Sequence, residues 1–431
     1  MSSTLVIKTR IFDILVQKSV AATRDIYPCR GKTGLARSLQ IQVLRGPIVS
    51  KAYMLTCQLL KPQDLSPRDV AAWKAMSAAT PAFASPLLSP EFALAVSAVR
   101  DDIRVAVWRD GTNVAGIFAH HRRPGRFARP AGAPFADYSA ILTFPDTRLE
   151  AAPALALAGI DRLHAAGLVD PHGIFAKVQG QADDAYAMDL TAEEPDNNVP
   201  KKHAKNINRL RRHMIEQLGE VRFIVGDRDP RHFETMLRIK REQVRGGGLH
   251  DFLAAPWVQR LMRDLFEADQ DGLHGLLITL MAGDTPLMYH FGPRLGAHAH
   301  PWVSSYHPEF STLSPGQIFL NDCRLPLKAS GIDWYDLSTG QQHYKPAFCN
   351  SHSVVHNVIV FSGSPGARLK AAFLGAARGV QHALGPLDHL LARIDRRMDQ
   401  IASLELGMAD RLQGFGLAVA TASRRSRSDH A

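Results

Sequence analysis

Cysteine is scarce in this chain of 431 residues and follows no metal-binding spacing. The four cysteines, Cys29, Cys57, Cys323 and Cys349, include no Cys-x-x-Cys pair. Zinc sites and disulfide scaffolds that are built from cysteine need closely spaced or numerous thiols. The composition therefore excludes a disulfide framework and favours a reducing, cytoplasmic setting.

Long apolar runs are also missing. A helix that spans a bilayer needs about 18 or more consecutive apolar residues, and the best candidate stretches, residues 151–160 and 354–361, are much shorter. The sequence therefore predicts no transmembrane helix. With 45% apolar and 21% charged residues, the chain is typical of a globular protein that is long enough for two or three domains.

Acidic residues are nearly absent from the first part of the chain. Residues 1–53 hold nine Lys or Arg residues against Asp13 and Asp25, so most of the net charge of +10 lies in this extension. The body that follows is nearly neutral, which argues against DNA as a partner. We interpret residues 1–53 as a basic, disordered arm or leader; a membrane-surface or targeting segment is the alternative.

The rest of the chain repeats one order of predicted elements. In each half, helices with Ser-Pro or Pro starts precede a hairpin, then a strand, a helix and a final strand. The predicted elements of the first half are helices 66–76 and 92–99, hairpin 103–120, strand 136–142, helix 152–166 and strand 173–178. Those of the second half are helix 203–218, strand 221–225, helices 230–244 and 257–268, hairpin 273–291, strand 302–306, a helix after Gly316 and strand 332–337.

This repeat predicts tandem α/β (α+β) domains over residues 54–200 and 201–363. Helices over 368–384 and 387–403 and a basic tail form a C-terminal helical extension, residues 364–431. In the second domain, a strand, a Ser/Pro/Gly loop and a helix follow one another. Backbone N–H groups at such a helix start attract anions. We therefore predict a site for an acyl donor or a phosphate at Ser314, Pro315, Gly316, Gln317 and Ile318.

From about residue 55 to 361 the chain resembles the bacterial GNAT-type acyltransferases known as CelD-like (cellulose biosynthesis) or holdfast N-acyltransferases, and through them the Fem aminoacyl transferases. The matching segments, in chain order, are Leu88–Phe92, Gly132-Ala133-Pro134 with Asp137-Tyr138, Lys240–Gln243, Tyr306–Phe310, Ser314–Gly316, and Asp336-Leu337 followed by Tyr344-Lys345. GNAT donor loops usually carry two glycines, whereas this loop has one, Gly316.

The resemblance implies a Fem-like tandem GNAT fold and acyl-CoA, with acetyl-CoA foremost, as the co-substrate. It implies no metal. The reaction that it implies is transfer of an acyl group to an amine, commonly an amino sugar of an exopolysaccharide or envelope polysaccharide. Two alternatives stay open: a non-catalytic accessory protein that keeps the GNAT scaffold in polysaccharide synthesis, and a Fem-like transferase that uses aminoacyl-tRNA.

Amide formation needs a base for the amine and stabilisation of the charge that develops on the donor carbonyl. The catalytic candidates are Lys345, Asp336, Tyr344 and Tyr306. Lys345 resembles by place a lysine of Fem-type enzymes, and its alternative interpretation is a solvated surface lysine.

The predicted substrate-binding residues are Lys240, Arg241 and Gln243 before a triple glycine, Asp137 and Tyr138, and Arg209 and Arg212 of a basic helix. That helix is either an electrostatic clamp for an anionic partner or a solvated face. Its basic face is also a candidate for contact with the inner membrane surface or a lipid-linked intermediate. His290, His298 and His300 form a weak zinc candidate, and ordinary strand-end histidines are the favoured interpretation.

Overall fold

The computed structural model describes residues 55–192, 199–247, 250–340, 344–383 and 401–405, together with Gly416. The predictions made for residues 1–53 and for most of the helix 387–403 lie outside this part of the chain. Within the described residues, none of the helices combines the length and the apolarity that crossing a bilayer requires.

The first half begins with a strand and two helices whose starts follow the local sequence. The Ser66 hydroxyl accepts a hydrogen bond from the backbone N–H of Asp69, and the Asp69 carboxylate accepts one from the backbone N–H of Ser66, which makes a capping box ahead of Pro67. Ser89 caps the next helix in the same way ahead of Pro90. The elements are β1 (Leu55–Leu60), α2 (Pro67–Ala79), α3 (Pro90–Val99), β2 (Ile103–Asp110), β3 (Asn113–Arg123), β4 (Phe127–Pro130), α4 (Ala151–Leu157), β5 (Arg162–Leu168) and β6 (Gly180–Asp189), with short 3₁₀ turns at Pro62–Asp64, Pro81–Phe83 and Pro86–Leu88.

The second half repeats this order. After α5 (Lys201–Leu218) come β7 (Val221–Val225), α6 (Pro230–Gly246), α7 (Pro256–Glu267), β8 (His274–Ala282), β9 (Thr285–Leu295), β10 (His298–Ala299), β11 (Val303–Tyr306), a 3₁₀ segment (Pro308–Leu313), α8 (Pro315–Asp322), α9 (Arg324–Ala329), β12 (Trp334–Thr339), α10 (Lys345–Phe348), β13 (Ser351–Phe361) and α11 (Pro365–Ala383). A strand, two helices and a hairpin thus open this order in both halves. The second half then has two short strands and two helices where the first has β4 and α4, and α10 lies between its last two strands.

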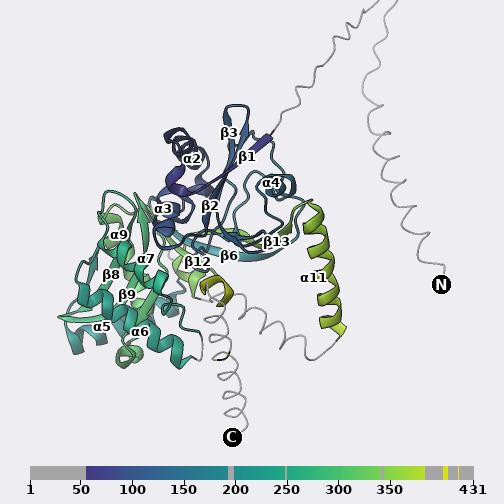
Figure 1. Cartoon of the computed structure of the whole chain (residues 1–431). Helices are drawn as coiled ribbons and strands as arrows, with labels where there is room; N and C mark the ends of the chain where they lie inside the picture. Colours follow the sequence, from purple (N-terminus) through teal and green to yellow (C-terminus); the bar gives the residue numbers. More distant parts are fainter. Residues whose placement is uncertain are drawn as a thin grey trace, which may run out of the picture. The chain divides into compact units, whose positions relative to one another are not determined.

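The strands of both halves form one mixed sheet in the described part of the chain (Figure 1). Its order is β1-β2-β3-β4-β5-β13-β6-β12-β10-β9-β8-β7, and β11 pairs with β9 beside this path. The order is symmetric about its middle, where the last strand of each half has crossed over. β13 pairs with β5 of the first half, β6 pairs with β12 of the second, and the two exchanged strands pair with each other.

Hydrophobic side chains pack on both faces of this sheet. One cluster joins α2 and α3 of the first half with α6 and α7 of the second, and it includes Trp73, Phe92, Phe233 and Trp257. A second cluster lies under α5 and α8, around Phe319 and Tyr335, and a third lies under α4. The first cluster spans the two halves, so they share buried apolar surface as well as a sheet.

Three predictions on the first half are wrong in detail. Residues 152–166 are not one helix: α4 ends at Leu157 because Gly159 adopts a positive φ of 67°, and β5 follows. The strand was not predicted because its alanine-rich sequence is typical of a helix. Residues 136–142 make only two isolated bridges, at Ser139 and Leu142, and residues 173–178 form turns.

In the second half, the observed elements agree better with those predicted from the sequence. Strand 221–225 and the starts of α6 and α7 are close to the predicted bounds. Pro326 does not kink a continuous helix, because the helix stops at Asp322 and α9 begins at Arg324, where the missing N–H of a proline near the start costs nothing. The predicted mixed α/β fold is confirmed.

Gly167 should be the most sensitive glycine of the first half. It has a φ of 55°, and a Cβ there would lie 1.7 Å from the carbonyl oxygen of Asp137. We expect Gly167→Ala to lower the free energy of unfolding by more than about 3 kcal/mol, since the left-handed backbone and the backbone clash both oppose a side chain.

Gly111→Ala is the matched control. Gly111 has a φ of 58°, but nothing lies within 4 Å of the position that a Cβ would take, so about 1–2 kcal/mol of backbone cost is expected alone. Urea unfolding of both variants measures the difference. Equal losses would contradict the close approach at Gly167.

Candidate active site

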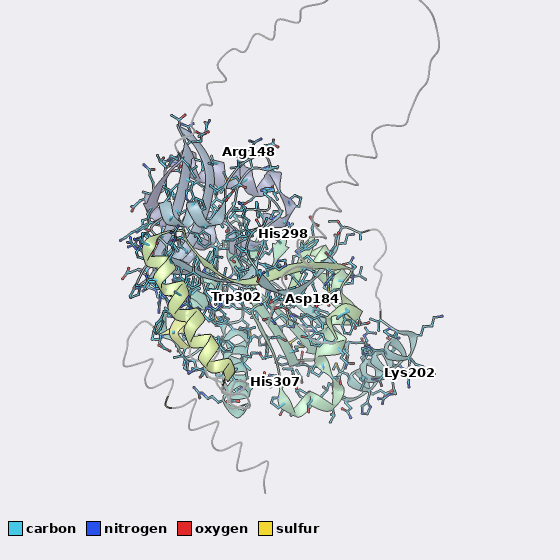
Figure 2. All side chains as sticks on the ribbon, turned by 90° about the vertical axis from the view of Figure 1, so that its right-hand side faces the viewer. Arg148, Asp184, Lys202, His298, Trp302 and His307 are labelled. Carbon is cyan, nitrogen blue, oxygen red and sulfur yellow. The ribbon has the colours of Figure 1, made fainter. Side chains whose placement is uncertain are left out.

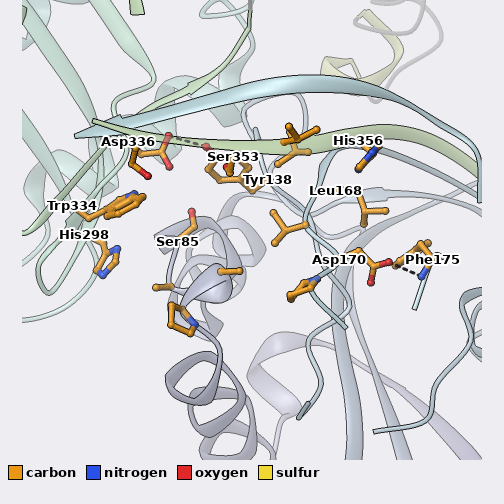
Figure 3. A pocket seen from close by; sticks show the side chains of 18 of the residues that line it. Ser85, Tyr138, Leu168, Asp170, Phe175, His298, Trp334, Asp336, Ser353 and His356 are labelled. Carbon is orange, nitrogen blue, oxygen red and sulfur yellow. Dashed lines mark hydrogen bonds between the residues drawn. The ribbon is translucent and has the colours of Figure 1, made fainter. Parts of the chain in front are cut away.

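A cavity of about 730 Å³ opens where elements of both halves meet. Figure 3 shows it along β13, with His298, Trp334 and Asp336 at one end and Leu168, Asp170 and Phe175 at the other. Its walls come from the 3₁₀ turns at Pro81–Pro86, the segment from Leu168 to Val178, the start of β12, and β13. Tyr138 also lines it, next to Asp336.

Asp336 is the acidic group at the polar end of this cavity. It lies on β12 and is mostly buried, and its Oδ1 accepts hydrogen bonds from the Tyr138 hydroxyl at 2.9 Å and from the Ser338 backbone at 2.6 Å. Ser338 reaches this position with a left-handed φ of 65°. Burial and the adjacent Asp336 raise the pKa of Tyr138, so its phenol keeps its proton and donates it. The orientation of the carboxylate is therefore fixed.

His300 lies between two carboxylates. Its Nε2 is 2.9 Å from Oδ2 of Asp137, and its Nδ1 is 3.6 Å from Oδ1 of Asp336. Its side chain is fully buried. Burial opposes the charged form, but Asp336 and Asp137 outweigh it and raise the pKa of His300 to about 10. Gly292 permits this position, because a Cβ there would lie 2.1 Å from the His300 carbonyl oxygen. A buried imidazolium thus balances the two acids.

Lys345 is buried, with 4% of its surface exposed, so the surface-lysine interpretation is wrong. Its Nζ donates to the carbonyl oxygens of Ser338 at 3.2 Å and Thr339 at 2.7 Å. Burial lowers its pKa, against the pull of Asp137 and Asp336. The ammonium group therefore holds the turn after β12 that orients Asp336. It is not among the described residues that line the cavity, and its place beside the donor carbonyl stays a prediction.

The two other tyrosines predicted to be catalytic are not at the cavity. Tyr344 is 47% exposed and Tyr306 is 38% exposed. The carbonyl of Tyr306 accepts a hydrogen bond from Gln243, and Lys240 donates to the carbonyl of Ser304. Lys240 and Gln243 thus hold α6 against β11. Arg241 pairs with Asp251 at 2.9 Å. These three predicted substrate-binding residues stabilise local structure.

The predicted donor loop lies at the start of α8. Ser314 has a left-handed φ of 49° and makes no side-chain cap. Pro315 has no N–H, and the N–H groups of Gln317 and Ile318 donate to the Ser314 carbonyl at 3.0 and 3.4 Å, so the N–H of Gly316 is the donor that this helix start can offer an anion. None of Ser314, Pro315, Gly316, Gln317 and Ile318 is among the described cavity-lining residues. The Oε1 of Gln317 instead accepts a hydrogen bond from the Nε2 of His203 at 3.1 Å. Because His203 lies on α5, this bond brings the basic start of α5 to the loop.

The outer face of α5 is solvent-exposed and basic. Arg209 and Arg212 are both exposed, whereas Ile207, Leu210 and Met214 are buried against the sheet. Figure 2 shows Lys202 on this helix well apart from the cavity residue His298. The basic face therefore does not reach the cavity.

The histidines do not form one cluster. His290 bonds the Tyr335 hydroxyl at 2.6 Å, and His298 stacks on Trp334 while burial lowers its pKa. Among the described residues, no group of three or more His, Cys, Asp or Glu side chains is placed to hold a metal ion. His300 is the residue whose role the sequence analysis missed. The only signal was its pairing with His298 in a His-x-His segment, which suggested strand-end or metal roles.

Comparison with known proteins found a family similarity in the second half. Residues 201–346, about a third of the chain, match the family model described as an acetyltransferase (GNAT) domain. The segment that carries α8, His300, Asp336 and Lys345 is therefore the part of the chain that is similar to a GNAT acetyltransferase domain. No curated protein matches the chain.

Several solved structures are similar to parts of this chain at low sequence identity. The C-terminal domain of a putative lysylphosphatidylglycerol synthetase from Agrobacterium fabrum has a TM-score of 0.42 at 13% identity and covers 70% of this chain and 94% of its own. A tandem GNAT protein from the clavulanic acid pathway has a TM-score of 0.42 at 14% identity, with 72% and 99% covered. FemX has a TM-score of 0.40 at 8% identity, with 62% and 90% covered.

His300 should make stability depend on pH. Because its pKa is raised from 6.5 to about 10 in the folded protein, its contribution is fully present below pH 6.5 and is lost as the pH rises through about 10. We expect His300→Gln to cost about 3 kcal/mol at pH 6, because two acids lose their buried counter-charge. The loss should shrink toward pH 10.

Urea unfolding of the wild type and the variant at several pH values measures this difference. His352→Gln is the control, because His352 pairs with Asp184 at 2.8 Å on the surface and should cost less than about 1 kcal/mol. A His300→Gln loss that stays constant from pH 6 to pH 10 would show that His300 is not held as an imidazolium.

Proposed function

We propose that this protein is a GNAT-type N-acyltransferase that transfers an acyl group from acyl-CoA to a primary amine held at Asp336. The observation that carries the proposal is the oriented carboxylate of Asp336, at the polar end of a cavity of about 730 Å³, within a segment that matches the GNAT domain. Carboxylates bind ammonium groups and serve as general bases. Asp336 can therefore both hold the acceptor and deprotonate it.

The surroundings of Asp336 suit this role. Its Oδ1 is occupied by the Tyr138 hydroxyl and the Ser338 backbone, and among the described residues Oδ2 has no hydrogen-bond partner. In the proposed reaction the neutral amine attacks the thioester carbonyl, the C–N bond forms and the C–S bond breaks. The proton that nitrogen loses passes to Asp336 and then to the leaving thiolate. Tyr138 and the turn held by Lys345 keep the carboxylate in place.

The donor phosphates are proposed to lie at the start of α8. Two features support this place: the uncapped first turn at Ser314 and the His203–Gln317 contact that brings α5 beside it. Lys201 and Lys202, also at the start of α5, are exposed. The N–H of Gly316, the helix dipole and the nearby ammonium groups together favour a polyphosphate.

The acceptor that the sequence resemblance implies is an amino sugar of an exported or envelope polysaccharide, and acetyl is the group that it implies. The exposed basic face of α5, with Arg209 and Arg212, supports contact with an anionic membrane surface that carries lipid-linked precursors. Two other functions would replace this proposal if the tests below fail: that of a non-catalytic GNAT scaffold and that of an aminoacyl-tRNA-dependent transferase.

Asp336→Asn tests the base directly. Asparagine keeps an oxygen that can accept from Tyr138 and Ser338 but cannot take a proton at neutral pH. We expect transfer from acetyl-CoA to a model amine to fall by about 100-fold or more, while the Kd for acetyl-CoA stays unchanged. Transfer is measured by release of free thiol. Unchanged activity in a folded variant would remove Asp336 from the reaction.

Gly316→Glu tests the donor site. A Cβ at Gly316 would meet only Met288, at 3.7 Å, so the variant should fold. A carboxylate at this helix start should weaken binding of acetyl-CoA at least about tenfold by repelling its phosphates. Calorimetric titration of acetyl-CoA, longer acyl-CoAs and charged tRNA into both proteins checks this. Binding of charged tRNA alone would favour the aminoacyl alternative, and no binding at all would favour the scaffold.

A further inference from the structure

We propose that the cavity beside Asp336 binds an aliphatic chain several methylenes longer than an acetyl group. The inference rests on the proposed function, because it assigns the end of that chain to the reacting group at Asp336. It concerns the substrate class of the same site. The shared chemistry is an unbranched apolar chain with a polar end, carried either by the acyl donor or by the amine.

The walls of the cavity away from Asp336 are mainly apolar, and Ser85, Ser353 and His356 are among the polar residues that also line them. They are formed by aliphatic, aromatic and proline side chains of three separate segments: Pro81, Ala82, Pro86, Leu168, Val169, Pro171, Phe175, Ala176, Val178, Val354, Val355 and Val358. Val354 is 54% exposed although it faces this cavity. An apolar lining of this extent favours a ligand that removes it from water.

The side chains around the cavity do not favour a phosphate-rich ligand, because His298 and His356 are the basic residues among those described as lining it. Among the described residues that line it, none is Lys or Arg. Asp170 at the far end is already used, because it accepts hydrogen bonds from the backbone of Ile174 at 2.9 Å and Phe175 at 2.8 Å. Asp336 therefore remains the acidic group open to a ligand, at one end. This arrangement suits a chain with an amine or thioester at Asp336 and an uncharged remainder.

The size of the cavity is the third observation. A volume of about 730 Å³ lies within the range of pockets that enclose whole drug-sized ligands. An acetyl group has two carbons and would leave most of the apolar wall in contact with water. Each further methylene that is buried should tighten binding about fourfold until the cavity is filled.

The test compares chain lengths in the wild type and in two variants that fill the cavity. Ala176→Trp and Ala82→Trp add bulk from different walls, and both alanines are exposed to the cavity and to solvent, so the changes should be tolerated. Ala75→Trp on α2 is the matched control, because Ala75 is exposed and does not line the cavity. Calorimetry measures the Kd of acetyl-CoA, octanoyl-CoA, ethylamine and octylamine for each protein.

We expect the wild type and Ala75→Trp to bind the eight-carbon member of one series at least about 100-fold more tightly than its two-carbon member. A folded filling variant should lose most of this gain. Tightening in the CoA series assigns the chain to the donor, and tightening in the amine series assigns it to the acceptor. Equal affinity for short and long chains, or a gain that persists in both filling variants, would overturn the proposal.

The chain-length experiment and the test of Asp336 can fail independently of each other. If Asp336→Asn retains full transfer while the chain-length gain depends on the cavity, the base is wrong and the chain site stands. If acetyl transfer depends on Asp336 but no chain-length gain exists, the enzyme stands and the chain site is wrong.

Discussion

The exchange of the last strands between the two halves is the constraint on which the rest of the structure depends. β13 leaves its own half to pair with β5, and β6 pairs with β12 in return. If either half were removed, the other would lose one of its inner strands. The backbone N–H and C=O groups of β5 or β12 would then be unpaired. One continuous sheet satisfies them. The seam between the halves consists of the strand pairs β5–β13, β13–β6 and β6–β12.

This seam also sets where charges can be buried. Asp137 and Tyr138 come from the first half, and His300 and Asp336 come from the second. A buried carboxylate beside a half-buried one is costly unless a cation and hydrogen-bond donors compensate them. His300 supplies the cation, Tyr138 and Ser338 donate to Asp336, and Lys345 fixes the turn that presents Ser338. The candidate site is therefore assembled only when both halves are folded together.

Local signals in the sequence were sufficient for many elements. Ser66 and Ser89 with their prolines set the starts of α2 and α3, and the turn at Gly111 set the first hairpin. β5 could not be predicted, because Ala and Leu at residues 162–168 suit a helix locally and only the pairing with β13 makes them a strand. The exchange itself joins residues almost 200 positions apart, which no local pattern encodes.

The same distinction applies to the site. Asp137, Tyr138, Asp336 and Lys345 were predicted as site residues, and the structure brings them together around His300. Their individual roles as catalytic or binding residues remain predictions. Lys345 was expected at the donor carbonyl, but it is buried on two backbone oxygens. Burial depends on the tertiary arrangement, so the sequence could not tell a turn-holding lysine from a catalytic one.

The position of β13 near the end of the described chain has a consequence for synthesis on the ribosome. β5 and β6 are complete once residue 189 has been made, but the strand that lies between them consists of residues 351–361. At about 5–20 residues per second, the nascent chain carries two inner strand edges without their partner for roughly 10–30 seconds. Open edges of this kind are templates for pairing with other chains. The fold that unites the two halves thus delays the closing of the first half until the second is almost complete.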